Sequence, residues 1–105
     1  MKRERIISPE LRRRIEERRR CNAQVVARLR TEKGWTQTEL AERAGVSLRW
    51  LKALESNQLP RDYRMQLEIR VVMALGFGLY ELKDFYGLVD DMVNKNLGQR
   101  RKGKP

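Results

Sequence analysis

The sequence predicts an all-α protein: a compact five-helix domain with a basic N-terminal helix or arm and a C-terminal helix. Two observations favour this fold class. Apolar residues recur at spacings of three and four, and no stretch alternates as a half-buried strand would. Glycine and hydroxyl residues separate these apolar stretches at positions where helices commonly end and begin. A length of 105 residues fits one small domain with extensions.

Charge divides the chain into four expected segments. These are a basic arm or helix at 1–21, a compact central domain at 22–82, a C-terminal helix at 83–97 and a disordered basic tail at 98–105. The formal net charge is +10, with nine basic against four acidic residues in positions 1–20 and five against none in positions 95–105. Such an excess indicates a polyanionic partner.

The first expected helix begins at Ser8, where a capping hydroxyl precedes Pro9 and an acidic residue follows. Residues 11–20 contain only Leu11 and Ile15 as apolar partners. Two interpretations stay open: a solvated helix stabilised by Glu/Arg pairs, or a basic arm that follows a phosphate backbone. The sequence also leaves open whether residues 8–33 form one helix.

The central domain is expected to begin with three helices. Val25, Val26 and Leu29 form the apolar stripe of its first helix, which ends near Gly34, with Trp35 packing just beyond it. Two short helices come next, at 37–44 and 47–56, joined at Gly45, where glycine adopts a left-handed backbone without steric cost.

Two further helices complete the chain. The helix at 62–75 turns inward Leu67, Val71, Val72 and Leu75. The helix at 79–97 carries one apolar stripe, consisting of Leu82, Tyr86, Val89 and Val93. In so small a chain this stripe buries either against its own core or against a second copy, and we favour a homodimer seam.

Composition argues against an enzyme. One cysteine and no histidine exclude an intrachain disulfide and a Cys/His zinc set, so no metal and no cofactor is expected. The adjacent carboxylate pairs at 16–17 and 90–91 diverge on a helix and do not share a site. With no secretory h-region and no run of roughly 18 apolar residues, we expect a cytoplasmic protein without a membrane partner.

The helix at 47–56 has two different faces. Leu51 and Leu54 point inward, whereas Arg49, Lys52 and Ala53 share another face at helical spacing. A helix with an apolar back and a cationic front, held across a short support helix, suits the major groove of double-stranded DNA.

Nine residues in this region match a known pattern in register: Gln37, Leu40, Ala41, Ala44, Gly45, Val46, Ser47, Leu51 and Leu54. The segment resembles the helix-turn-helix of the lambda-repressor and Cro family, over about Val25 to Leu82. The resemblance implies a bacterial or phage sequence-specific DNA-binding regulator of transcription that acts as a homodimer. The alternative is an antitoxin or adaptor of the same fold that binds a protein partner.

The resemblance also implies site residues. The positions that read bases would be Ser47, Leu48, Arg49, Lys52 and Ala53. The positions that contact phosphate would be Arg30, Thr36, Gln37, Trp50, Arg61 and Arg64. Arg30 and Glu55 would form a structural pair. Simpler roles stay open for several of them: Gln37 as a helix cap, Lys52 as a phosphate contact or a solvated side chain, and Trp50 as a cover for the support helix.

Overall fold

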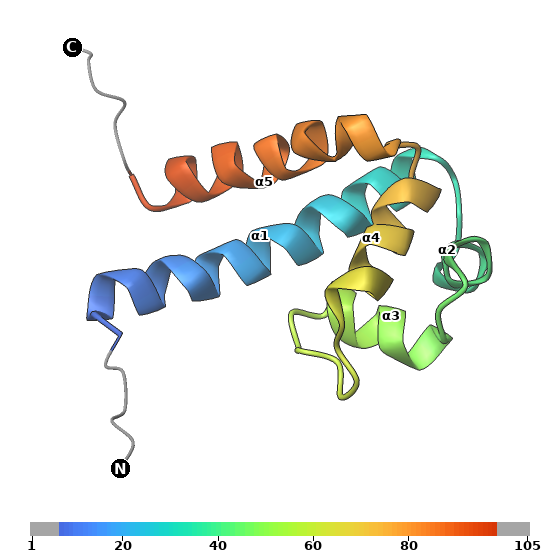
Figure 1. The fold of residues 1–105 in the computed structure, drawn as a ribbon, viewed down its shortest axis with the longest axis horizontal. Coiled ribbons are helices and arrows are strands. Elements are labelled where there is room, and N and C mark those ends of the chain that lie inside the picture. The colour runs from blue at the N-terminus through green and yellow to red at the C-terminus, as the bar shows by residue number, and fades with distance from the viewer. Residues whose placement is uncertain (1–6, 99–105) are drawn as a thin grey trace.

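The computed structural model describes residues 7–98 and is all-helical over that range, with no strand (Figure 1). Its helices are α1 (Pro9–Glu32), α2 (Gln37–Ala44), α3 (Leu48–Glu55), α4 (Met65–Ala74) and α5 (Leu82–Asn96), with a short 3-10 turn η1 (Leu79–Glu81) before α5. The expected all-α, five-helix architecture is confirmed. The predictions for residues 1–6 and 99–105, including the disordered tail, lie outside the described residues.

The N-terminal helix α1 is continuous for 24 residues and passes the expected boundary at residue 21 without a break. The Ser8 hydroxyl accepts the Leu11 amide at 3.1 Å, which caps the helix as predicted. Cys21, Val25 and Val26 are all fully buried, so the apolar face continues across the boundary. The question that the sequence left open therefore has a clear answer: residues 9–32 form one helix.

The turn between α2 and α3 follows the predicted chemistry. Gly45 ends α2 with a φ of 72°, in the left-handed region. The Ser47 hydroxyl then accepts the Trp50 amide at 3.0 Å and starts α3. After α3, Asn57 is left-handed with a φ of 63°, a conformation that asparagine tolerates better than most residues. Ser47 therefore marks the start of α3, and the left-handed Asn57 marks the turn that follows its end.

Helix α5 runs back along α1 in the opposite direction (Figure 1). Phe85, Val89 and Val93 are 0–1% exposed, and Phe85 meets the rings of Phe77 and Tyr86 edge-on. The stripe expected as a dimer seam therefore packs into the core of its own chain. Because Val89 and Val93 have no exposed surface left, they do not fit the seam assignment, and the partly buried Leu82 and Tyr86 pack against the same core.

Polar contacts reinforce the α1–α5 packing. Arg18 forms an ion pair with Asp90, and Arg14 donates to the Asn94 side chain at 2.7 Å. Within α1, Arg20 pairs with Glu17 at 2.6 Å. Several arginines of the predicted basic arm are thus held by neighbouring side chains, as the interpretation with Glu/Arg pairs expects. Within residues 7–98, no helix has the length and apolarity needed to cross a membrane.

Candidate nucleic-acid interface

Helix α3 separates its two faces as the sequence predicts. Leu51 and Leu54 are buried, whereas Arg49 and Lys52 are exposed on the other side. Among the described residues, neither Arg49 nor Lys52 takes part in an ion pair or a side-chain hydrogen bond. The α3 surface therefore presents two positive charges that no carboxylate of the described chain neutralises.

A hollow of about 260 Å³ lies beside this charged face, between α3 and the loop that follows it. Residues assigned to base reading and to phosphate contact line it together. They are Ser47, Arg49, Ala53 and Arg61, with Trp50, Pro60 and Asp62 completing the wall. Arg64 is exposed at the start of α4 outside this hollow, and Leu48 is partly buried at the first position of α3.

The N-terminus of α2 provides a second polar element. The Thr36 hydroxyl accepts the Glu39 amide at 3.1 Å, and the Glu39 carboxylate accepts the Thr36 amide at 2.8 Å. This capping box occupies two of the polar groups at the helix start. Within the described chain, the backbone amides of Gln37 and Thr38 have no acceptor. Free amides at the positive end of a helix suit a phosphate oxygen.

Arg30 of α1 binds the Glu55 carboxylate of α3 with two of its nitrogens. Its Nε and Nη2 atoms donate to the two Glu55 oxygens at 2.9 and 3.0 Å. Its Nη1 atom donates to the Trp35 carbonyl at 2.8 Å. The structure therefore brings together the predicted Arg30–Glu55 pair, and this pair fixes the end of α3 against α1. A phosphate role for Arg30 would have to use its remaining N–H groups.

Gln37 belongs to the same cluster. Its side-chain amide donates to Glu55 at 3.0 Å, so the side chain ties α2 to α3. The phosphate contact predicted for Gln37 then rests on its free backbone amide rather than on its side chain.

The phosphate contact predicted for Trp50 does not fit the structure. Trp50 is only 6% exposed, and its indole N–H donates to the Asp62 carbonyl at 3.3 Å. Its ring stacks on Tyr63 with centroids 6.1 Å apart and planes 8° from parallel. Burying a large aromatic side chain in the protein stabilises it more than contact with the solvated sugar-phosphate backbone of DNA would. Trp50 instead holds the loop after α3 in place.

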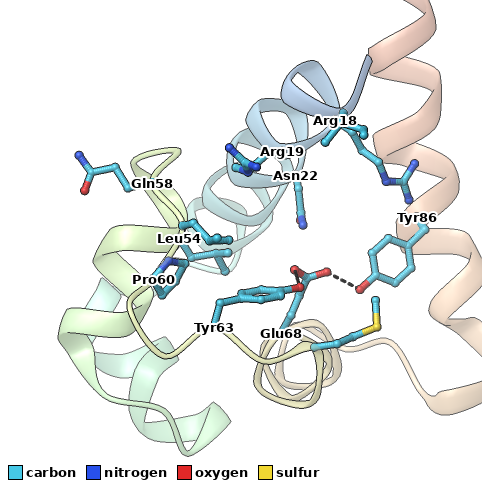
Figure 2. Close-up of a pocket in the computed structure, with 12 residues that line it drawn as sticks. Arg18, Arg19, Asn22, Leu54, Gln58, Pro60, Tyr63, Glu68 and Tyr86 are labelled. Atoms are coloured by element: carbon cyan, nitrogen blue, oxygen red, sulfur yellow. Dashed lines mark hydrogen bonds between the residues drawn. The ribbon is translucent and has the colours of Figure 1, made fainter. Parts of the chain in front are cut away.

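The buried carboxylate of Glu68 binds Tyr63 of the same loop, and the sequence did not lead us to predict it. Glu68 on α4 is 4% exposed, and its two oxygens accept the hydroxyls of Tyr63 at 2.8 Å and of Tyr86 at 2.6 Å (Figure 2). Burial, and then the bond to Glu68, raise the pKa of each tyrosine well above its ordinary value. A signal was present, because Glu68 lies on the same helix face as Val71, Val72 and Leu75.

The single cysteine, Cys21, lies in the core of the domain. Cys21 is buried, and burial, followed by its hydrogen bond to Glu17, raises the pKa of its thiol. A raised pKa disfavours the thiolate that nucleophilic chemistry needs. No group of three metal-ligating side chains gathers anywhere in the described part of the chain.

Helices α2 and α3 cross at a tight turn, and α3 has one buried face and one cationic face, which is the arrangement of a helix-turn-helix. Residues 26–66 match a family model described as Helix-turn-helix. This segment therefore forms a helix-turn-helix domain, similar to those of the lambda-repressor and Cro family. Neither a curated protein nor a solved structure matches the chain.

Proposed function

We propose that the protein is a sequence-specific DNA-binding regulator of transcription that inserts α3 into the major groove. One observation carries this proposal: Arg49 and Lys52 are exposed and unpaired on α3, while the opposite face of the same helix is buried. A helix that exposes cationic donors without intramolecular partners is ready to bind a polyanion.

The residues divide into readers and anchors. Arg49 lies near the start of α3, where side chains reach furthest into the groove, and its planar fork matches the O6 and N7 acceptors of guanine. Lys52 and Ala53 lie one turn later, and Ser47 and Leu48 lie at the helix start. The free amides of Gln37 and Thr38, with Arg61 and Arg64, would bind phosphate and set the register of α3.

We further propose that the protein acts in the cytoplasm as a homodimer on a palindromic site. The two half-sites would then lie about 34–36 Å apart, one turn of DNA. The contact between copies would not involve Val89 and Val93, which are buried within each chain.

The test is selection of bound DNA from a random pool with the purified full-length protein. A sequence-specific regulator enriches one motif, and a dimer enriches two inverted copies of it. Affinity that depends on salt but enriches no motif would contradict sequence-specific reading, because phosphate contacts alone carry no sequence information. Enrichment of a single unrepeated motif would contradict the homodimer and leave the reading by α3 intact.

A further inference from the structure

A second groove, of about 260 Å³, lies between α1 and the loop after α3 (Figure 2), and Arg49 does not line it. Its walls are mainly apolar and come from four elements. The apolar residues are Ile15 of α1, Leu54 of α3, Leu59 and Pro60 of the loop after α3, and Met65 at the start of α4. Glu68, Tyr63 and Tyr86 form its floor, where the tyrosine hydroxyls already satisfy the carboxylate.

The apolar side chains of this groove are unusually exposed. Ile15, Leu59 and Met65 are 42%, 57% and 58% exposed. On α1, Leu11 extends the stripe of Ile15 at a spacing of four and is also exposed. Large apolar residues that are exposed together mark a surface that another molecule covers. The stripe extends beyond the groove itself, so an elongated segment fits it better than a small molecule does.

The charge around the groove selects the occupant. Arg19 lines the groove, and Arg12 lies two turns before it on the same side of α1. Neither has an ion-pair or hydrogen-bond partner among the described residues, whereas Arg18 is held by Asp90. Glu68, the one acidic residue that lines the groove, is buried and bonded to both tyrosines. The rim therefore carries two arginines without an ion-pair partner among the described residues, with the exposed Glu16 between them on α1 and paired with neither.

We infer that this groove binds an amphipathic, acidic helical segment of another protein, with apolar side chains seated over Ile15 and Leu59 and carboxylates facing Arg12 and Arg19. A second copy of this chain is disfavoured as the occupant, because its acidic helix α5 buries its apolar residues Phe85, Val89 and Val93 within its own core. The groove and the proposed DNA interface meet at Pro60 but use different residues of α3, Leu54 for the groove and Arg49 for the interface, so this inference does not depend on DNA binding.

The test uses two synthetic peptides of about 18 residues, or five helical turns. Both contain the same leucines and glutamates; one spaces the leucines along a single helix face, and the other scrambles them. Titration calorimetry with the full-length protein should detect the amphipathic peptide and at least about tenfold weaker binding of the scrambled one, since only the first can seat its leucines together.

Substitutions on the protein separate the groove from general charge attraction. Ile15→Asp and Leu59→Asp should each weaken the amphipathic peptide by about tenfold or more, as loss of an apolar anchor does. Leu79→Asp is the matched control, because Leu79 is 66% exposed and does not line the groove. All three positions are exposed, and circular dichroism verifies that each variant is folded.

Three results would overturn the inference. The two peptides binding equally would mean that only charge attracts them. Equal weakening by Leu79→Asp and Ile15→Asp would place the contact elsewhere. A protein that sediments as a dimer and becomes monomeric on Ile15→Asp would show that a second copy covers the groove.

Discussion

Arg18 and Arg20 of α1 and Arg49 of α3 look alike in the sequence and differ in the structure. On α1, Arg18 is paired with Asp90 on α5, and Arg20 with Glu17. On α3, Arg49 has no partner among the described residues. The number of positive charges on a helix therefore says less about its binding partner than whether neighbouring carboxylates already neutralise those charges.

The two regions also use apolar surface differently. Helix α5 buries its apolar stripe against α1 and so stabilises the monomer. Helix α3 buries the face with Leu51 and Leu54 and exposes the face with Arg49 to solvent. Substitutions in the first region should therefore change stability, and substitutions on the front of α3 should change DNA binding alone.

The largest expected effect is in the α1–α5 region. Phe85→Ala should lower the free energy of unfolding by about 3–5 kcal/mol, because it empties a fully buried site where Phe85 meets two aromatic rings. Urea denaturation of the purified protein measures this change. A loss below about 1 kcal/mol would mean that Phe85 is not part of the monomer core, and the seam between copies would be reconsidered.

The next effect concerns the ion pair between Arg30 of α1 and Glu55 at the end of α3. Glu55→Ala should cost about 3 kcal/mol, because it leaves the Arg30 guanidinium without a carboxylate in a place where its side chain is only 17% exposed. Glu55→Gln is the matched control, since it preserves shape and one acceptor and should cost less. If both variants unfold like the wild type, the Arg30–Glu55 pair does not hold α3 against α1.

A smaller effect should appear at high pH. Folding raises the pKa of Tyr63 and of Tyr86. The stability that this shift contributes is therefore fully present below the ordinary tyrosine pKa of about 10, and it is lost as the pH rises above that value. The slope should be up to about 1.4 kcal/mol per pH unit for each tyrosine. Denaturation at several pH values should show a shallower decline for Tyr86→Phe.

Tyr80→Phe is the control for this pH effect, because Tyr80 is 92% exposed and should leave the decline unchanged. Equal slopes for the wild type and Tyr86→Phe would contradict the network around Glu68.

The sequence predicted local structure well because the responsible residues act locally. Ser8, Ser47 and Gly45 start or end helices through bonds and backbone angles within a few residues. The inward faces of α3 and α4 followed from spacing, and the helix-turn-helix followed from its turn residues and from its resemblance to a known family. The site residues on the front of α3 were placed where expected, although their DNA contacts stay predictions.

Features that join distant segments were harder to predict. Spacing showed that the stripe on α5 must be buried, but not by what, because its partner α1 lies some 70 residues earlier. Trp50 was assigned to phosphate because its place on α3 was known and its contact with Tyr63 was not. Glu68 was missed because a carboxylate on an apolar face has meaning only once Tyr63 and Tyr86 are seen beside it.

The most direct test of base reading by Arg49 compares two variants that each remove one positive charge. Arg49→Ala removes an unpaired arginine of α3, and Arg20→Ala removes a paired arginine of α1. Affinity for the selected DNA site is measured for both at the same salt concentration. Arg49→Ala should weaken specific binding by about 1–3 kcal/mol, or roughly 5- to 150-fold, and relax the preference at one base pair per half-site. Arg20→Ala should leave specific binding close to that of the wild type. Equal losses for the two variants, with every base preference retained, would contradict the assignment of Arg49 as a reader.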